Sequence, residues 1–135
     1  MSGSIAQGTS QTHGNTHILH FLVRLPRPME DVWTAVATPE GIGAWCTAVH
    51  ALEPRLDGAV SLRGLGSGRV TAWDVDRVAE YTLDEGGRLR FHLERDGAAE
   101  CVLRFTHEFQ GESGPSDMDW RRKFEQLITV LGAAP

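Results

Sequence analysis

His107 is the residue of this sequence best suited to chemistry, because it lies in the alternating segment Leu103-Arg104-Phe105-Thr106-His107. In a β-strand, this alternation places His107 on the same side as Leu103, Phe105 and Phe109, and that side faces a core. Burial there would favour the neutral imidazole, which can hydrogen-bond a ligand carbonyl or act as a general base. The structural alternative, a histidine near a strand end that bonds to the backbone, is the commoner role.

Three other histidines, near the N-terminus, do not have the pattern of a metal site. They are His13, His17 and His20. His13 precedes the first expected strand, so nothing in the pattern positions it. His17 and His20 are three residues apart within that strand and therefore face opposite sides of the sheet. We expect no metal at these positions.

The remaining polar motifs are typical of turns and helix caps. Asp74 with Asp76, and Asp117 with Asp119, lie near expected element ends and lack a partner histidine or a ligand set. The glycine run Gly64–Gly68 leads into a strand, so no helix N-terminus follows it to receive a phosphate. The sequence has no nucleophile elbow and no paired acid–base motif. It therefore predicts no catalytic residue and no cofactor, and it leans against an enzyme.

Composition indicates one globular domain. A chain of 135 residues with 41% hydrophobic residues is large enough and apolar enough for a single core. The net charge of -5 disfavours binding to nucleic acid or to an anionic membrane. The N-terminus has no signal-peptide or membrane-spanning pattern, and Cys46 and Cys101 lack metal-ligand spacing. We expect a cytoplasmic protein with two free thiols.

The first part of the chain predicts one strand followed by two short helices. Residues 1–15 lack periodicity and are expected to form a disordered tail before a domain over residues 16–135. The expected elements are a strand over Thr16–Leu25, a helix over Met29–Ala37, and a second helix that Thr38 caps and that runs from Pro39 to Trp45.

The middle of the chain predicts strands and turns only. The expected strands are Val49–Pro54, Ala59–Arg63, Arg69–Val75, Val78–Leu83, Arg88–Arg95 and Glu100–Phe109. The expected turns lie at Asp57-Gly58, across Gly64, Gly66 and Gly68, at Glu85-Gly86-Gly87 and at Asp96-Gly97. Clean apolar–polar alternation in the last two strands favours one antiparallel sheet with a polar outer face.

The final segment, Ser116–Leu131, predicts an amphipathic helix. Its apolar stripe consists of Trp120, Phe124, Leu127, Ile128 and Leu131. Ser116 followed by Asp119 resembles a capping box with a shorter acid. Because the stripe must be buried, we expect the helix to lie across the concave face of the curved sheet. The order of elements is therefore that of an α+β helix-grip fold.

The segment Leu25–Trp45 reads LPRPMEDVWTAVATPEGIGAW and carries a family pattern at Pro28, Val32, Trp33, Thr38, Pro39, Glu40 and Trp45. Later matches are Asp57-Gly58 with Val60 and Leu62, the segment Leu103–His107, and Asp119-Trp120. These residues resemble the Aha-type family of activators of heat-shock-chaperone ATPases, within the START-like (SRPBCC) superfamily. The resemblance covers Thr16–Gly132 and implies the helix-grip fold. That superfamily spans ligand carriers, cyclases, hydrolases and protein-binding modules, so the function stays open.

A helix lying over a curved sheet is expected to leave an apolar pocket beneath it. By alternation, the pocket-lining residues are Trp45, Trp73, Leu89, Phe91, Leu103, Phe105, His107, Trp120, Phe124 and Leu127. The alternative is that these large side chains close-pack into a dry core.

Three functions follow from this reading. The first is binding of a small hydrophobic or aromatic ligand in that pocket. The second, implied by the resemblance, is a protein-interaction module that stimulates a ninety-kilodalton heat-shock-chaperone ATPase. The third is a cyclase or hydrolase that uses His107 with Tyr81 or an aspartate. A homodimer through the edge of the first strand is also possible.

Overall fold

One antiparallel sheet forms the frame of the protein. The computed structural model describes residues 3–8, 10–84, 87–110 and 117–133. Within these ranges the sheet has nine strands in the order β1-β3-β9-β8-β7-β6-β5-β4, with β2 paired to β3. The strands are β1 (Ser4–Gln7), β2 (Gln11–His13), β3 (Thr16–Leu25), β4 (Val49–Leu52), β5 (Ala59–Leu62), β6 (Gly66–Asp74), β7 (Val78–Leu83), β8 (Arg88–Asp96) and β9 (Glu100–Gln110).

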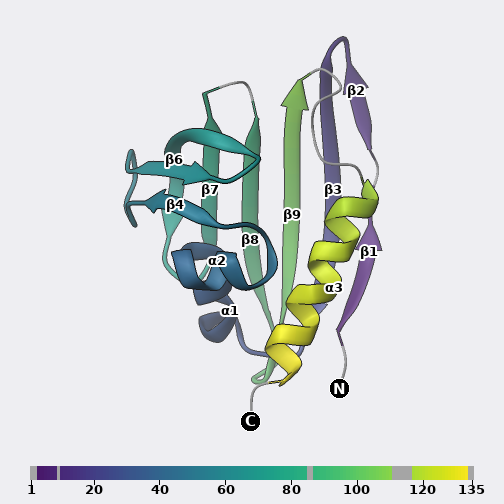
Figure 1. The fold of residues 1–135 in the computed structure, drawn as a ribbon. Helices are drawn as coiled ribbons and strands as arrows, with labels where there is room; N and C mark the ends of the chain where they lie inside the picture. The colour runs from purple at the N-terminus through teal and green to yellow at the C-terminus, as the bar shows by residue number, and fades with distance from the viewer. Residues whose placement is uncertain (1–2, 9, 85–86, 111–116, 134–135) are drawn as a thin grey trace.

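Three helices cover one face of this curved sheet (Figure 1). They are α1 (Met29–Ala37), α2 (Pro39–Trp45) and α3 (Asp117–Ala133). Figure 1 shows α3 running diagonally in front of β9, β3 and β1, with α1 and α2 beside it in front of β7 and β8. The predicted α+β helix-grip architecture is confirmed. No helix in the described ranges is both long and apolar enough to cross a membrane.

Strand alternation decides which side chains enter the core. Along β3, β8 and β9 the buried residues recur at every second position, as the sequence predicts, with Val102 of β9 as an additional buried residue. The inward residues of β3 and β9 lie directly opposite one another: Leu19 with His107, Phe21 with Phe105, and Val23 with Leu103. Cross-strand neighbours of this kind pack as pairs, so the centre of the sheet presents one apolar face to the helices.

The two short helices are fixed by side-chain hydrogen bonds. Thr38 Oγ1 accepts from the amide of Gly41 at 3.0 Å, which confirms it as the cap of α2. Trp45 Nε1 donates to the carbonyl of Ala35 at 2.7 Å and ties α2 to α1. The hydroxyl of Tyr81 on β7 donates to a carbonyl at the end of α1, that of Val36, at 2.6 Å. The helix pair is therefore held against the sheet.

The N-terminal residues correct one expectation. The sequence predicts a disordered tail over residues 1–15, but in the described part of that range β1 and β2 both pair with β3. The physical reason is that β3 would otherwise leave a row of unpaired backbone groups at the sheet edge. Ile5 adds apolar packing against the core, and the amide of Gly8 donates to the carbonyl of His20 at 2.8 Å.

The glycine run corrects a second expectation. The predicted turn across Gly64, Gly66 and Gly68 is shorter than expected, because β6 already begins at Gly66. Gly64 has a φ of 77° and belongs to the turn. Gly68 lies in the strand, where a Cβ atom would come within 1.9 Å of the carbonyl oxygen of Thr82 on β7. Two further predicted features, the turn residues Glu85-Gly86 and the cap Ser116, lie outside the described residues.

We predict that Gly68→Ala destabilises the protein by about 1–3 kcal/mol, because the new methyl group overpacks against the β7 backbone. Gly43→Ala in α2 is the matched control, since a Cβ there meets nothing within 4 Å. The control is expected to raise stability by roughly 0.5–1 kcal/mol, through the higher helix propensity of alanine. Urea unfolding measures both changes. An unchanged midpoint for Gly68→Ala would show that β6 and β7 do not approach so closely.

Candidate functional site

The buried face of α3 meets the sheet through aromatic rings. Trp120, Phe124 and Leu127, spaced by four and three residues, are each 0% exposed. The ring of Trp120 lies 4.5 Å from that of Phe105 on β9, and the ring of Phe124 lies 5.1 Å from it, centroid to centroid. Tilted and edge-on contacts at these distances are the favoured geometries for aromatic pairs. The helical stripe predicted from the sequence therefore packs on the predicted face of the sheet.

Helix α2 closes the side of this interface. Trp45 stacks on Phe124 at 5.5 Å and meets Phe91 of β8 edge-on at 6.1 Å. Lys123 Nζ donates to the carbonyl of Cys46, at the C-terminal end of α2, at 2.6 Å. A cation at this position also interacts favourably with the helix dipole. The rings of α2, α3, β8 and β9 thus meet in one place.

The structure brings together nearly all the residues predicted to line a pocket. Those buried in the common core are Trp45, Leu89, Phe91, Leu103, Phe105, His107, Trp120, Phe124 and Leu127. Trp73 is the exception, because it is only partly buried and lies beside Trp33 of α1, with ring centroids 5.1 Å apart. Alternation alone could not separate Trp73 from the others, since which helix covers β6 is a tertiary property.

His107 is the polar residue of this interface. Its side chain is 3% exposed, and the indole Nε1–H of Trp120 donates to its Nδ1 at 3.0 Å. The ring also lies 4.8 Å from that of Phe109 and 6.4 Å from that of Phe105. Burial lowers the pKa of His107 to about 4, so the ring is neutral at pH 7. The structural alternative from the sequence was a hydrogen bond between His107 and the backbone. The partner is instead the side chain of Trp120.

Sequence reasoning missed Trp120 as that partner. The usable signal was that a buried indole N–H needs an acceptor, and that His107 is the polar residue on the facing side of β9. The other ring nitrogen of His107, Nε2, makes no hydrogen bond within the described residues. Among the described residues, the fully buried side-chain atom without a hydrogen-bond partner is Nε of Arg88, so Nε2 of His107 is unbonded but keeps slight contact with the surface. It is therefore a donor that a ligand can reach.

The other buried titratable groups do not assist His107. Tyr81, considered as its catalytic partner, donates instead to the carbonyl of Val36, and burial raises its pKa. Burial likewise raises the pKa of Cys46 to about 11 and that of Cys101 to about 12, and both thiols are free. Thiols with such pKa values are protonated at pH 7 and are poor nucleophiles.

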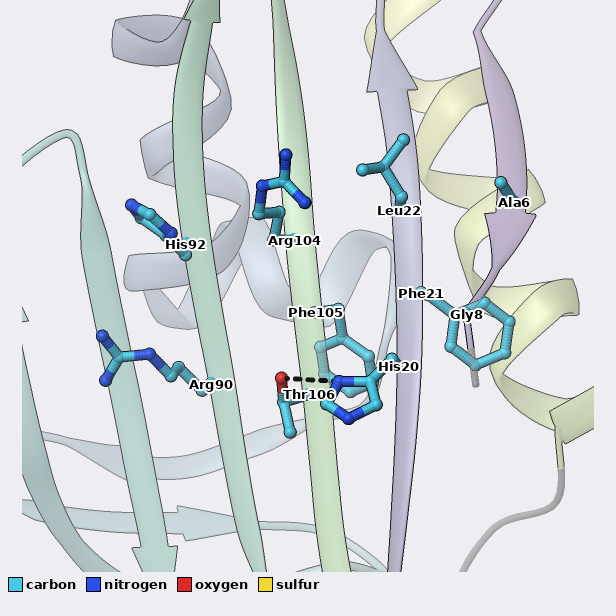
Figure 2. Close-up of a pocket in the computed structure, with 10 residues that line it drawn as sticks. All are labelled: Ala6, Gly8, His20, Phe21, Leu22, Arg90, His92, Arg104, Phe105 and Thr106. Atoms are coloured by element: carbon cyan, nitrogen blue, oxygen red, sulfur yellow. Dashed lines mark hydrogen bonds between the residues drawn. The ribbon is translucent and has the colours of Figure 1, made fainter. Parts of the chain in front are cut away.

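A groove of about 610 Å³ lies on the opposite, convex face of the sheet (Figure 2). It crosses β1, β3, β9 and β8 and is therefore distinct from the interface under α3. Its lining consists of Ala6, Gly8, His20, Phe21, Leu22, Arg90, His92, Arg104, Phe105 and Thr106. Figure 2 shows the arginine and histidine side chains standing on outward positions of the strands, as the alternation predicts.

Arg90, Arg104 and His20, which line this groove, are partnered by neighbours on the sheet. Arg90 donates to Glu80 at 3.0 Å, and Arg104 donates to Glu94. Burial opposes ionisation of Glu80, but hydrogen bonds from Thr71 and Arg90 outweigh it and lower the pKa of this carboxyl. His20 approaches Thr106 at 3.4 Å. Ion pairs on the convex face thus occupy the two arginines of the groove, as is usual for a solvated surface.

His17 and His20 are placed as predicted, whereas His13, expected in a disordered tail, lies in β2 opposite Thr16. His17 lies beside Phe109, with ring centroids 5.2 Å apart, and its Nδ1 is 3.2 Å from the hydroxyl of Thr12. His20, three residues later, lies in the groove on the convex face. The two imidazoles therefore lie on opposite sides of β3, because successive side chains alternate along a strand.

Comparison with known proteins identifies the fold. No family model matches the sequence, and no curated protein matches it significantly. Among solved structures, EF2215 from Enterococcus faecalis, a conserved protein of unknown function, aligns with a TM-score of 0.75 at 12% identity over 94% of this chain and 79% of its own. CalU16 from Micromonospora echinospora aligns with a TM-score of 0.73 at 18% identity over 98% of this chain and 88% of its own.

The Aha1 dimer from Colwellia psychrerythraea also aligns, with a TM-score of 0.67 at 17% identity over 86% of this chain and 96% of its own. These likenesses confirm the START-like, Aha1-type helix-grip fold that the sequence resemblance implies. At such identities they establish the fold alone, because one fold supports many functions.

We predict that His107 makes stability depend on pH. Its pKa of about 4 in the folded protein lies below its ordinary value of 6.5, so the unfolded chain binds the proton more tightly. Stability is therefore complete above pH 6.5 and is lost as the pH falls towards 4, by about 3 kcal/mol in all.

His107→Gln should remove this loss, because glutamine can accept from Trp120 but does not titrate. Urea unfolding at pH 7.5 and pH 4.5 measures the difference between the two proteins. His50→Gln, at an exposed position of β4, controls for removing an imidazole. If wild type and His107→Gln lose the same stability between these pH values, the imidazole is not buried as described.

Proposed function

We propose that this domain binds a small apolar or aromatic ligand between the concave face of the sheet and α3. The observation that carries the proposal is the composition of that interface, where aromatic rings of α2, α3, β8 and β9 meet. The imidazole of His107 lies at the Trp120 side of this cluster, in contact with the rings of Phe105, Phe109 and Trp120. Ligand sites in proteins have this composition, with mostly apolar and aromatic walls and a few placed polar groups. A planar aromatic molecule inserted between these rings would make ring–ring contacts of the same kind as those it displaces.

The arrangement of the helices supports access to this interface. Helix α3 is joined to α2 through Trp45, Phe124 and the hydrogen bond from Lys123 to the carbonyl of Cys46. One further side-chain hydrogen bond, from Trp120 to His107, joins α3 to β9, and its contacts with β1 and β3 are side-chain packing rather than ladder hydrogen bonds. A helix held by packing can shift by a small amount at lower cost than a strand held by a hydrogen-bond ladder.

The two alternative functions have weaker support. A protein-interaction module needs a contiguous apolar patch, whereas the large apolar side chains that are well exposed in the described residues are Leu56 and Val75, on separate turns. An enzyme needs a second titratable group beside His107, and Tyr81 is bonded elsewhere. The Aha1 structure that aligns with this chain is a dimer, so a homodimer is compatible with this fold.

We predict that neutral bicyclic aromatics, from naphthalene to 2-acetylnaphthalene, saturably change the tryptophan fluorescence, because Trp45 and Trp120 lie in the interface. Leucine methyl NMR locates the site. The methyl groups of Leu89 and Leu127 should shift on titration, and those of Leu22, in the convex groove, should not. A linear, non-saturating response would contradict ligand binding. Saturable shifts confined to Leu22 would place the site on the convex face instead.

A further inference from the structure

We propose that the ligand of this site is a neutral molecule carrying a hydrogen-bond acceptor, that Nε2–H of His107 donates to this acceptor, and that Trp120 holds the imidazole in the tautomer that makes the donation possible. This inference rests on the proposed function and names its ligand class.

The tautomer follows from the chemistry of the partner. An indole nitrogen can only donate a hydrogen bond. Since Nε1 of Trp120 lies 3.0 Å from Nδ1 of His107, Nδ1 must present its lone pair. A neutral imidazole with an unprotonated Nδ1 carries its proton on Nε2. The doubly protonated ring would set two N–H groups against each other, and the low pKa of the buried ring agrees with its neutrality.

The ligand must therefore accept a hydrogen bond. Within the described residues no group bonds to Nε2 of His107, and the side chain is 3% exposed. The residues directly opposite on the flanking strands are Leu19 on β3 and Leu89 on β8, neither of which offers an acceptor in its side chain. A carbonyl, ether or ring oxygen of a ligand is the complement that this donor lacks.

The ligand must also be neutral. Apart from His107, the buried polar or charged residue among those described is Glu80, whose carboxylate bonds to Thr71 and Arg90. The partly buried cation of α3, Lys123, is bonded to the carbonyl of Cys46 at 2.6 Å. A charged ligand would lose its hydration without gaining an opposite charge, which strongly disfavours burial.

The same geometry assigns His107 a binding role rather than the role of a general base. Its one lone pair, on Nδ1, is occupied by the indole N–H, so the ring has no free site at which to take a proton. Trp120 acts through His107 and is a positioning residue.

The test uses three probes of equal size on the full-length protein. 2-Acetylnaphthalene offers a carbonyl, 2-isopropenylnaphthalene replaces the oxygen by a methylene group, and 2-naphthoate adds a negative charge. We expect the ketone to bind about five- to tenfold more tightly than the alkene, as one hydrogen bond allows, and the naphthoate to bind more weakly than the ketone. The ¹⁵N spectrum of the His107 ring at pH 7 should show a protonated Nε2 and an unprotonated Nδ1.

Variants separate donation from packing. His107→Leu should abolish the preference for the ketone, whereas His107→Gln, which can both accept from Trp120 and donate to the ligand, should retain part of it. Trp120→Phe should reduce the preference and give a mixture of His107 tautomers in the ¹⁵N spectrum. If a variant does not fold, the wild-type affinity ratio and the wild-type ¹⁵N spectrum still decide.

Each outcome has one meaning. Equal saturable binding of ketone and alkene, or tighter binding of naphthoate, overturns this inference and leaves the proposed function intact. A protonated Nδ1 in wild type overturns the inference whatever binds. Failure of all three probes to bind overturns the proposed function and this inference with it.

Discussion

The indole N–H of Trp120 needs an acceptor in the protein interior, and this requirement determines how α3 lies on the sheet. Apolar packing of Phe124 and Leu127 drives burial but has no direction, so it would tolerate several rotations of the helix. The hydrogen bond to Nδ1 of His107 at 3.0 Å is directional and fixes one of them. It also settles which nitrogen of the imidazole stays available, so one contact links the fold to the proposed function.

The two faces of the sheet carry different kinds of side chains. Its concave face carries aromatic rings and a neutral imidazole, and its convex face carries arginine–carboxylate pairs such as Arg90 with Glu80. Both follow from the same alternation along β8 and β9. The proposed apolar, neutral ligand fits the first face better, because the second carries partnered charges in contact with water. The convex groove seen in Figure 2 is therefore a feature of the outer surface.

The sequence predicted the frame because periodicity is local. Strand β3, the Thr38 cap of α2 and the buried stripe of α3 each follow from residues within one element. Three features depended on distant partners and were missed: pairing of β1 with the edge of β3, the close approach of β7 to Gly68, and the bond from Trp120 to His107. Each is a contact between segments whose register no local pattern encodes.

The most direct measurement is the scalar coupling across the N–H···N hydrogen bond between Nε1 of Trp120 and Nδ1 of His107, in ¹⁵N-labelled protein at pH 7. If α3 lies on the concave face as described, this coupling is resolved and the indole proton exchanges slowly with water. An absent coupling, with an indole proton that exchanges as fast as that of a solvent-exposed tryptophan, would contradict the packing of α3 on the sheet and everything inferred from it.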